Sequence, residues 1–220
     1  MLTKRLPPIL LAAILALMCA SCSSPLREQV RAEKLEAQGN LGEALKIYQD
    51  TLSHVPRQDS RRISQLYVRI GECLWRLGHP SEALTAFQQA VDIDTSNLVA
   101  HIKIGTMYLA GGAPGSAREQ ANFVLQRMDN NADAWALLGA AAAVNGEDGK
   151  AKWAYTRVLA AEPTRVSVAV ALAELYDHEG QTDMARTILR NSADADRSRA
   201  MPLLALARLE EEEGNSPVAE

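Results

Sequence analysis

Aromatic residues are scarce in this chain: phenylalanine, tryptophan and tyrosine make up 5% of its 220 residues, although hydrophobic residues make up 47%. Alanine supplies much of the difference, as expected where helices pack closely, and the composition indicates an all-helical fold. Positive charge is also limited, because 23 Lys and Arg stand against 27 Asp and Glu, without a basic cluster. Nucleic acid is therefore not an expected partner, since its binding calls for clustered positive charge.

Sequence motifs for catalysis or metal binding are missing as well. The four histidines, His54, His79, His101 and His178, are scattered, and no two have the i, i+4 spacing that places metal ligands on one helix face. Neither a Gly-x-Ser-x-Gly motif nor a phosphate-binding Gly-rich loop occurs. We therefore predict that the protein is not an enzyme and has no cofactor and no metal site.

A repeat dominates the middle of the chain. Two units of 34 residues, 98–131 and 132–165, align without a gap. With the first residue of each unit as position 1, positions 4, 7, 8 and 11 form one stripe of a first helix, and positions 20, 24 and 27 form one stripe of a second helix. Because one such pair is too small to bury its own core, we expect successive pairs to stack.

The predicted repeat core combines small and large residues. Small residues at positions 8 and 20 let the two backbones approach, while larger residues fill the space beside them. His101, at position 4, is expected to replace a core-edge tryptophan, and Cys73 to be a buried apolar residue rather than a reactive thiol. The predicted core residues are Gly71, Ala83, Gly105, Tyr108, Ala117, Trp135, Gly139, Ala151, Tyr155, Tyr176 and Ala185.

This pattern resembles the tetratricopeptide repeat, W-x2-L-G-x2-Y, then A-x3-F, then P. Trp135, Leu138, Gly139, Ala151 and Tyr155 carry the resemblance in one unit. The resemblance implies an all-α, right-handed α-solenoid of about five helix pairs with a C-terminal capping helix. It also implies a protein or peptide as the partner.

The predicted solenoid covers residues 26–214. Its repeats lie at about 25–58, 64–97, 98–131, 132–165 and 166–199, followed by a half-repeat at 200–214 and a tail at 215–220. Five inserted residues, 59–63, are expected to lengthen the start of the next helix.

The N-terminal segment 1–21 reads as an export signal. Lys4 and Arg5 precede an apolar run of twelve residues, 9–20, which is too short to span a bilayer but suits a signal peptide. Cys22, preceded by small residues, resembles the lipid-bearing cysteine of a bacterial lipobox, and 22–25 would be the lipid-anchored linker. The alternatives are lipidation at Cys19, plain cleavage or a retained anchor. By resemblance to Gram-negative lipoproteins, Ser23 implies an outer-membrane location on the periplasmic side.

The family resemblance also implies a concave groove lined by positions 2, 5, 9, 12 and 13 of the first helices. It would be apolar in its middle and acidic towards its C-terminal end, and the Lys and Asn of the family's carboxylate clamp are absent. The alternative is that these residues pack against a neighbouring helix or a second copy. The predicted groove residues are Val68, Glu72, Trp75, Ile102, Thr106, Leu109, Ala136, Ala140, Ala143, Val170 and Glu174, with Val99 and Val144 at the same positions.

Together these features predict a lipid-anchored scaffold that holds an envelope protein or peptide. It resembles in general form the repeat lipoproteins of pilus, secretion and outer-membrane assembly machinery. The alternative is a structural envelope protein that self-associates as a homo-oligomer.

Overall fold

The computed structural model describes residues 25–195 and 200–214. Over these ranges the secondary structure consists of eleven α-helices without a strand. The predicted signal peptide and Cys22 lie outside the described residues. Among the helices that are described, none has the length and apolar character needed to cross a membrane.

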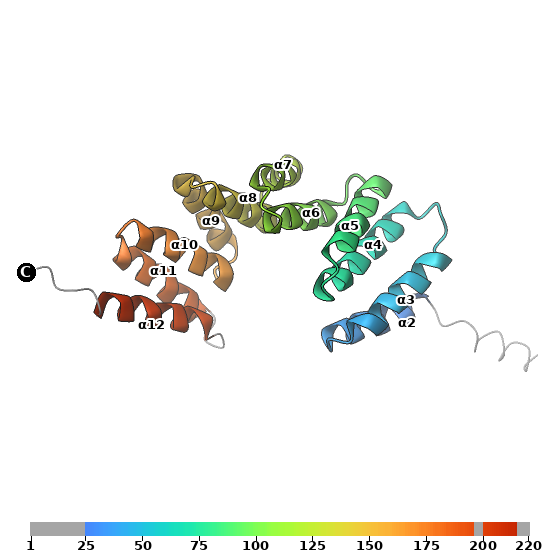
Figure 1. The fold of residues 1–220 in the computed structure, drawn as a ribbon, viewed down its shortest axis with the longest axis horizontal. Coiled ribbons are helices and arrows are strands. Elements are labelled where there is room, and N and C mark those ends of the chain that lie inside the picture. The colour runs from blue at the N-terminus through green and yellow to red at the C-terminus, as the bar shows by residue number, and fades with distance from the viewer. Residues whose placement is uncertain (1–24, 196–199, 215–220) are drawn as a thin grey trace, which may run out of the picture. The chain divides into compact units, whose positions relative to one another are not determined.

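The chain divides into two compact units, 1–97 and 98–220 (Figure 1). The first unit contains α2 (Pro25–Ala37), α3 (Leu41–His54), α4 (Ser60–Arg76) and α5 (Pro80–Ile93). The second unit contains α6 (Leu98–Ala110), α7 (Pro114–Leu125), α8 (Ala132–Val144), α9 (Asp148–Ala161), α10 (Val166–His178), α11 (Thr182–Ala195) and α12 (Met201–Gly214).

Successive helices form five pairs, and a single helix follows, as the sequence predicts. Each pair turns at a glycine with positive φ, a conformation that disfavours other residues. In the third pair, Gly112 donates its N–H to Leu109 O (3.1 Å) and Ala113 donates to Tyr108 O (2.8 Å), which satisfies the last carbonyls of α6. The five turn glycines are Gly39, Gly78, Gly112, Gly146 and Gly180.

The starts of several helices follow directly from their residues. Pro80 and Pro114 occupy the first turn of α5 and α7, where a missing N–H leaves no helix hydrogen bond unmade. Asp59 caps the longest described helix, α4, by accepting from the N–H of Arg62 at 3.1 Å. The inserted segment 59–63 thus forms the cap and first turn of α4.

Side chains of other helices fill the space beside the predicted glycines of the first helices, and at two of the three glycines this side chain is an aromatic ring. A Cβ at Gly139 would lie 2.6 Å from Tyr155 Cε1, and one at Gly71 would lie 2.5 Å from Phe87 Cε1. The third pair has Ala121 instead of a ring, and a Cβ at Gly105 would meet Leu137 of the next pair at 2.4 Å. Position 8 is therefore small mainly because a side chain of the second or next helix occupies that space.

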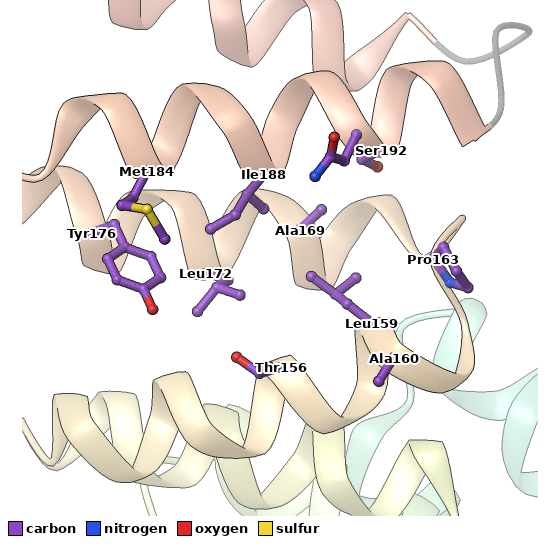
Figure 2. Close-up of a pocket in the computed structure, with 11 residues that line it drawn as sticks. Thr156, Leu159, Ala160, Pro163, Ala169, Leu172, Tyr176, Met184, Ile188 and Ser192 are labelled. Carbon is purple, nitrogen blue, oxygen red and sulfur yellow. The ribbon is translucent and has the colours of Figure 1, made fainter.

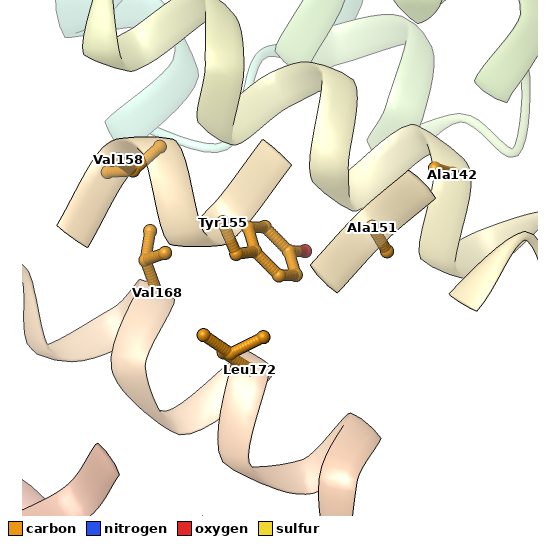
Figure 3. Packing of buried hydrophobic residues seen from close by; sticks show 6 residues of the cluster. All are labelled: Ala142, Ala151, Tyr155, Val158, Val168 and Leu172. Atoms are coloured by element: carbon orange, nitrogen blue, oxygen red, sulfur yellow. The ribbon is translucent and has the colours of Figure 1, made fainter. Parts of the chain in front are cut away.

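The best-developed cluster of the second unit joins the fourth and fifth pairs. Figure 3 shows the side chains of this cluster, with the Tyr155 ring among them. The other members, all buried, are Ala142, Ala151, Val158, Val168 and Leu172. Because Val168 and Leu172 belong to α10, this core stabilises the stacking of one pair on the next, as expected for repeats.

The last helix closes the end of the second unit. Leu209 of α12 is buried against Ala173, Ala185 and Leu189 of the fifth pair. This confirms the predicted capping helix. All-α architecture with five helix pairs and a cap is thus the observed fold.

Candidate functional site

Six of the predicted groove residues of the second unit, all apolar, are half-buried. Ile102 and Leu109 of α6 pack against the cluster of Ala117 and Leu137, and still expose part of their surface. The predicted alanines of α8, Ala136, Ala140 and Ala143, contact the Tyr155 cluster in the same way. Packing on a neighbouring helix and partial exposure therefore occur together in these side chains.

Two valines at groove positions are more open. Val99 is 54% exposed and Val144 is 62% exposed, at opposite ends of the first helices α6 and α8. Thr106 is also exposed, but its hydroxyl donates to Ile102 O at 2.9 Å within the helix. The first-helix face of α6 and α8 consequently exposes two valines beside the polar Thr106.

The acidic end of the predicted groove is partly neutralised. Glu174 of α10 is exposed and lies 3.3 Å from the guanidinium of Arg208 on α12. Val170, four residues earlier, is half-buried against the cluster that α12 covers. The negative charge that sequence suggests here is therefore shared with a cation from the capping helix.

The first unit holds three predicted groove residues in different environments. Val68 is only 5% exposed, so it belongs to the packed interior and has no surface to offer a partner, contrary to the prediction. The helix that carries it, α4, packs against both α3 and α5. Glu72 is half-buried and accepts from Arg69 at 3.2 Å, whereas Trp75 is 41% exposed.

A polar network sits beside Cys73 in the first unit. The Tyr48 hydroxyl donates to Glu36 at 3.1 Å, and burial followed by this carboxylate raises the pKa of Tyr48. Burial, then Glu36, raises the pKa of the Cys73 thiol to about 11. Since the thiolate is the reactive form, Cys73 is an unreactive buried side chain at neutral pH.

His101 lies in the packed interior of the second unit. Its ring stacks on Phe123 with 3.9 Å between centroids, and its Nδ1 is 2.7 Å from Gln120 Oε1. It is thus used in packing, as predicted. Over the described ranges, no group of three or more His, Cys, Asp and Glu side chains is placed to hold a metal ion.

Ion pairs join consecutive repeats along the second helices. Arg118 of α7 pairs with Glu147, which lies between α8 and α9. Lys152 of α9 lies 2.5 Å from Glu179, which lies between α10 and α11. Hydrogen bonds from Lys150 and then Arg118 lower the pKa of Glu147 to about 2. These ion pairs link α7 and α9 each to the following helix pair.

The structure also contains a cleft that the sequence reasoning missed. It lies among α9, α10 and α11 and has a volume of about 430 Å³. Figure 2 shows Leu159, Leu172 and Ile188 turned into this space. The sequence signal for it is Ala169 at position 4, where the three preceding repeats carry a ring. The lining residues are Thr156, Leu159, Ala160, Pro163, Ala169, Leu172, Tyr176, Met184, Ile188, Asn191 and Ser192.

Comparison with known families agrees with the helix-pair geometry. Residues 29–96 match the family profile of the tetratricopeptide repeat. The fold is a tetratricopeptide repeat fold. A comparison with curated proteins finds no match.

Solved structures extend this tetratricopeptide repeat fold over most of the chain. The thermophilic repeat protein TTC0263 of Thermus thermophilus has a TM-score of 0.72 at 20% identity, covering 86% of this chain and 100% of its own. A chain of the APC/C hetero-tetramer Cut9–Hcn1 gives 0.71 at 18% identity, covering 86% of this chain and 36% of its own. YrrB, described as having an unusual peptide-binding site, has a TM-score of 0.56 at 18% identity, covering 88% of this chain and 97% of its own.

Proposed function

We propose that this protein is an interaction scaffold that binds a protein partner on the first-helix face of its second unit. The observation that carries the proposal is the apolar surface formed by α6 and α8, where Val99 and Val144 are 54% and 62% exposed beside half-buried Ile102, Leu109 and Ala140. Exposed apolar surface of this kind commonly marks a binding site. A peptide lying across adjacent helices would bury it.

The similar structures support this class of function. YrrB is described as having a peptide-binding site, and the Cut9–Hcn1 chain belongs to a hetero-tetramer. Proteins of this fold thus include one with a peptide-binding site and one that assembles with other chains.

The proposed location of the scaffold is the cell envelope. The charged start, the apolar run 9–20 and the cysteine after small residues support export and lipidation at Cys22. A lipid anchor there would hold the repeats close to the outer membrane, next to assembly machinery for pili, secretion or outer-membrane proteins. Palmitate labelling should disappear in Cys22→Ala and persist in Cys19→Ala; the reverse result would assign the anchor to Cys19.

The binding test uses the two exposed valines, because charges there leave the core intact. Val99→Glu and Val144→Glu together should abolish recovery of the partner from crosslinked cells, since each places a charge on the apolar face. Met128→Glu, at an exposed residue in the turn after α7, is the matched control and should leave recovery unchanged. If the partner is recovered equally with the double variant, this face is not the binding surface.

A second candidate function is self-association, favoured by the capping helix. Met201, Leu203 and Leu204 of α12 are all more than half exposed and apolar. A second copy could cover them. Sedimentation of the purified chain should then show a concentration-dependent dimer that Leu203→Glu dissociates, whereas a monomer at every concentration would eliminate this candidate.

A further inference from the structure

The cleft among α9, α10 and α11 is distinct from the first-helix face. It is bounded by the second helices of two consecutive pairs, with Ala169 and Leu172 of α10 between them. We propose that this cleft is a second binding site, which accepts a bulky aromatic side chain, best a tryptophan, from a protein partner. The proposal does not depend on the groove.

The cleft exists because the fifth repeat lacks a ring at position 4. Tyr67, His101 and Trp135 occupy this position in the three preceding repeats, whereas the fifth has Ala169, which is fully buried. A methyl group thus stands where the three preceding first helices carry a ring. The volume of about 430 Å³ is within the ~300–1,000 Å³ usual for ligand sites.

The fourth repeat shows what fills the equivalent space. The Trp135 indole packs against the Tyr155 cluster and meets Trp153 edge-on, with 4.8 Å between centroids. Its Nε1 donates to Asp129 O at 2.7 Å. Arg157 covers the Trp135 ring at 4.7 Å. The repeat geometry therefore already accommodates an indole between a first helix and its flanking second helices.

A buried hydroxyl in the cleft lacks a partner. Ser192 is 2% exposed, and its Oγ has no hydrogen bond. Val124 and Val158 occupy the same position, 27, in the two preceding repeats. A buried unpaired hydroxyl is unfavourable, so a partner group that donates to it gains a hydrogen bond. An indole N–H or a peptide N–H has this chemistry.

The lining further restricts the occupant. It includes no charged side chain, which disfavours anionic and cationic ligands. Met184, 47% exposed, and half-buried Ile188 line it, and methionine adapts its shape to apolar groups. Large uncharged aromatic side chains combine apolar area with a donor, and they dominate binding energy at protein interfaces.

N-acetyl-L-tryptophanamide is the probe for this site, added to the purified full chain in a ligand-observed NMR titration. We expect saturable binding with a Kd of about 1 mM or tighter, and none for N-acetylglycinamide. Ala169→Trp should weaken binding at least tenfold because its own indole fills the cleft. Ala110→Trp, which adds a ring at an exposed residue of α6, is the matched control and should leave the Kd unchanged.

The folded state of each variant is checked by circular dichroism. If Ala169→Trp does not fold, Met184→Glu replaces it, because a charge at the exposed rim spares the core and should weaken binding at least fivefold. Ser192→Val should weaken it as well by removing the hydroxyl. Absence of saturable binding, or an unchanged Kd in the folded cleft variant, would overturn the proposal.

Discussion

Gly139 is the residue at which the packing of a repeat can be measured most directly. A Cβ added by Gly139→Ala would lie 2.6 Å from Tyr155 Cε1 and 2.7 Å from Cδ1, whereas non-bonded carbons pack at about 3.5–4.0 Å. The Tyr155 ring is 5% exposed and cannot move into solvent. Overpacking of this kind costs about 1–3 kcal/mol. Alanine has a better helix propensity than glycine, which offsets about 1 kcal/mol of this cost. The free energy of unfolding should therefore fall by up to about 2 kcal/mol.

The matched control is Gly149→Ala in α9, because a Cβ there meets nothing within 4 Å. In this variant only the helix propensity changes, so its free energy of unfolding should rise by up to about 1 kcal/mol. Urea unfolding followed by circular dichroism at 222 nm measures both free energies. The control should be more stable than Gly139→Ala by about 1–3 kcal/mol. Equal shifts in the two variants would show that the Tyr155 ring does not occupy the space beside Gly139.

Three further predictions concern single side chains. Ser192→Val should raise the free energy of unfolding in urea by about 1–3 kcal/mol, since it removes an unpaired buried hydroxyl; a loss would show that the hydroxyl is satisfied. Cys73 should resist iodoacetamide at neutral pH in native protein and react fully in urea, because its pKa is raised to about 11; rapid native labelling would contradict its burial. The pKa of the Glu147 carboxyl is lowered from 4.5 to about 2. Between these pH values the folded protein therefore binds fewer protons at this carboxyl than the unfolded chain does. The contribution of Glu147 to the stability of the fold is complete above pH 4.5 and is lost as the pH falls towards 2. Glu147→Gln should flatten this part of the stability curve, and an unchanged slope would refute the assignment.

The helix pairs could be predicted because their signals are local and repeated. Turn glycines recur every 34 residues from Gly78 to Gly180, and the proline at the start of α5 recurs at the start of α7. These residues act through their own backbone conformation, so the sequence alone carries the information. The capping role of α12 followed from the same register.

The surfaces were harder to predict because exposure depends on neighbouring elements. Val68 and Ile102 share one repeat position, yet Val68 is buried and Ile102 is half-buried. Likewise, Arg208 pairs with Glu174 across two helices that are far apart in the sequence. The cleft beside Ala169 depends on three helices at once, and a small residue by itself does not reveal the space around it.

The scaffold function is tested most directly by crosslinking in intact cells, followed by purification of the full-length chain through a C-terminal tag. Wild type and the Met128→Glu control should recover one envelope protein or machine in stoichiometric amount, and the Val99→Glu, Val144→Glu variant should recover none. Recovery of only the protein itself from wild type would contradict a scaffold for another protein and would support self-association.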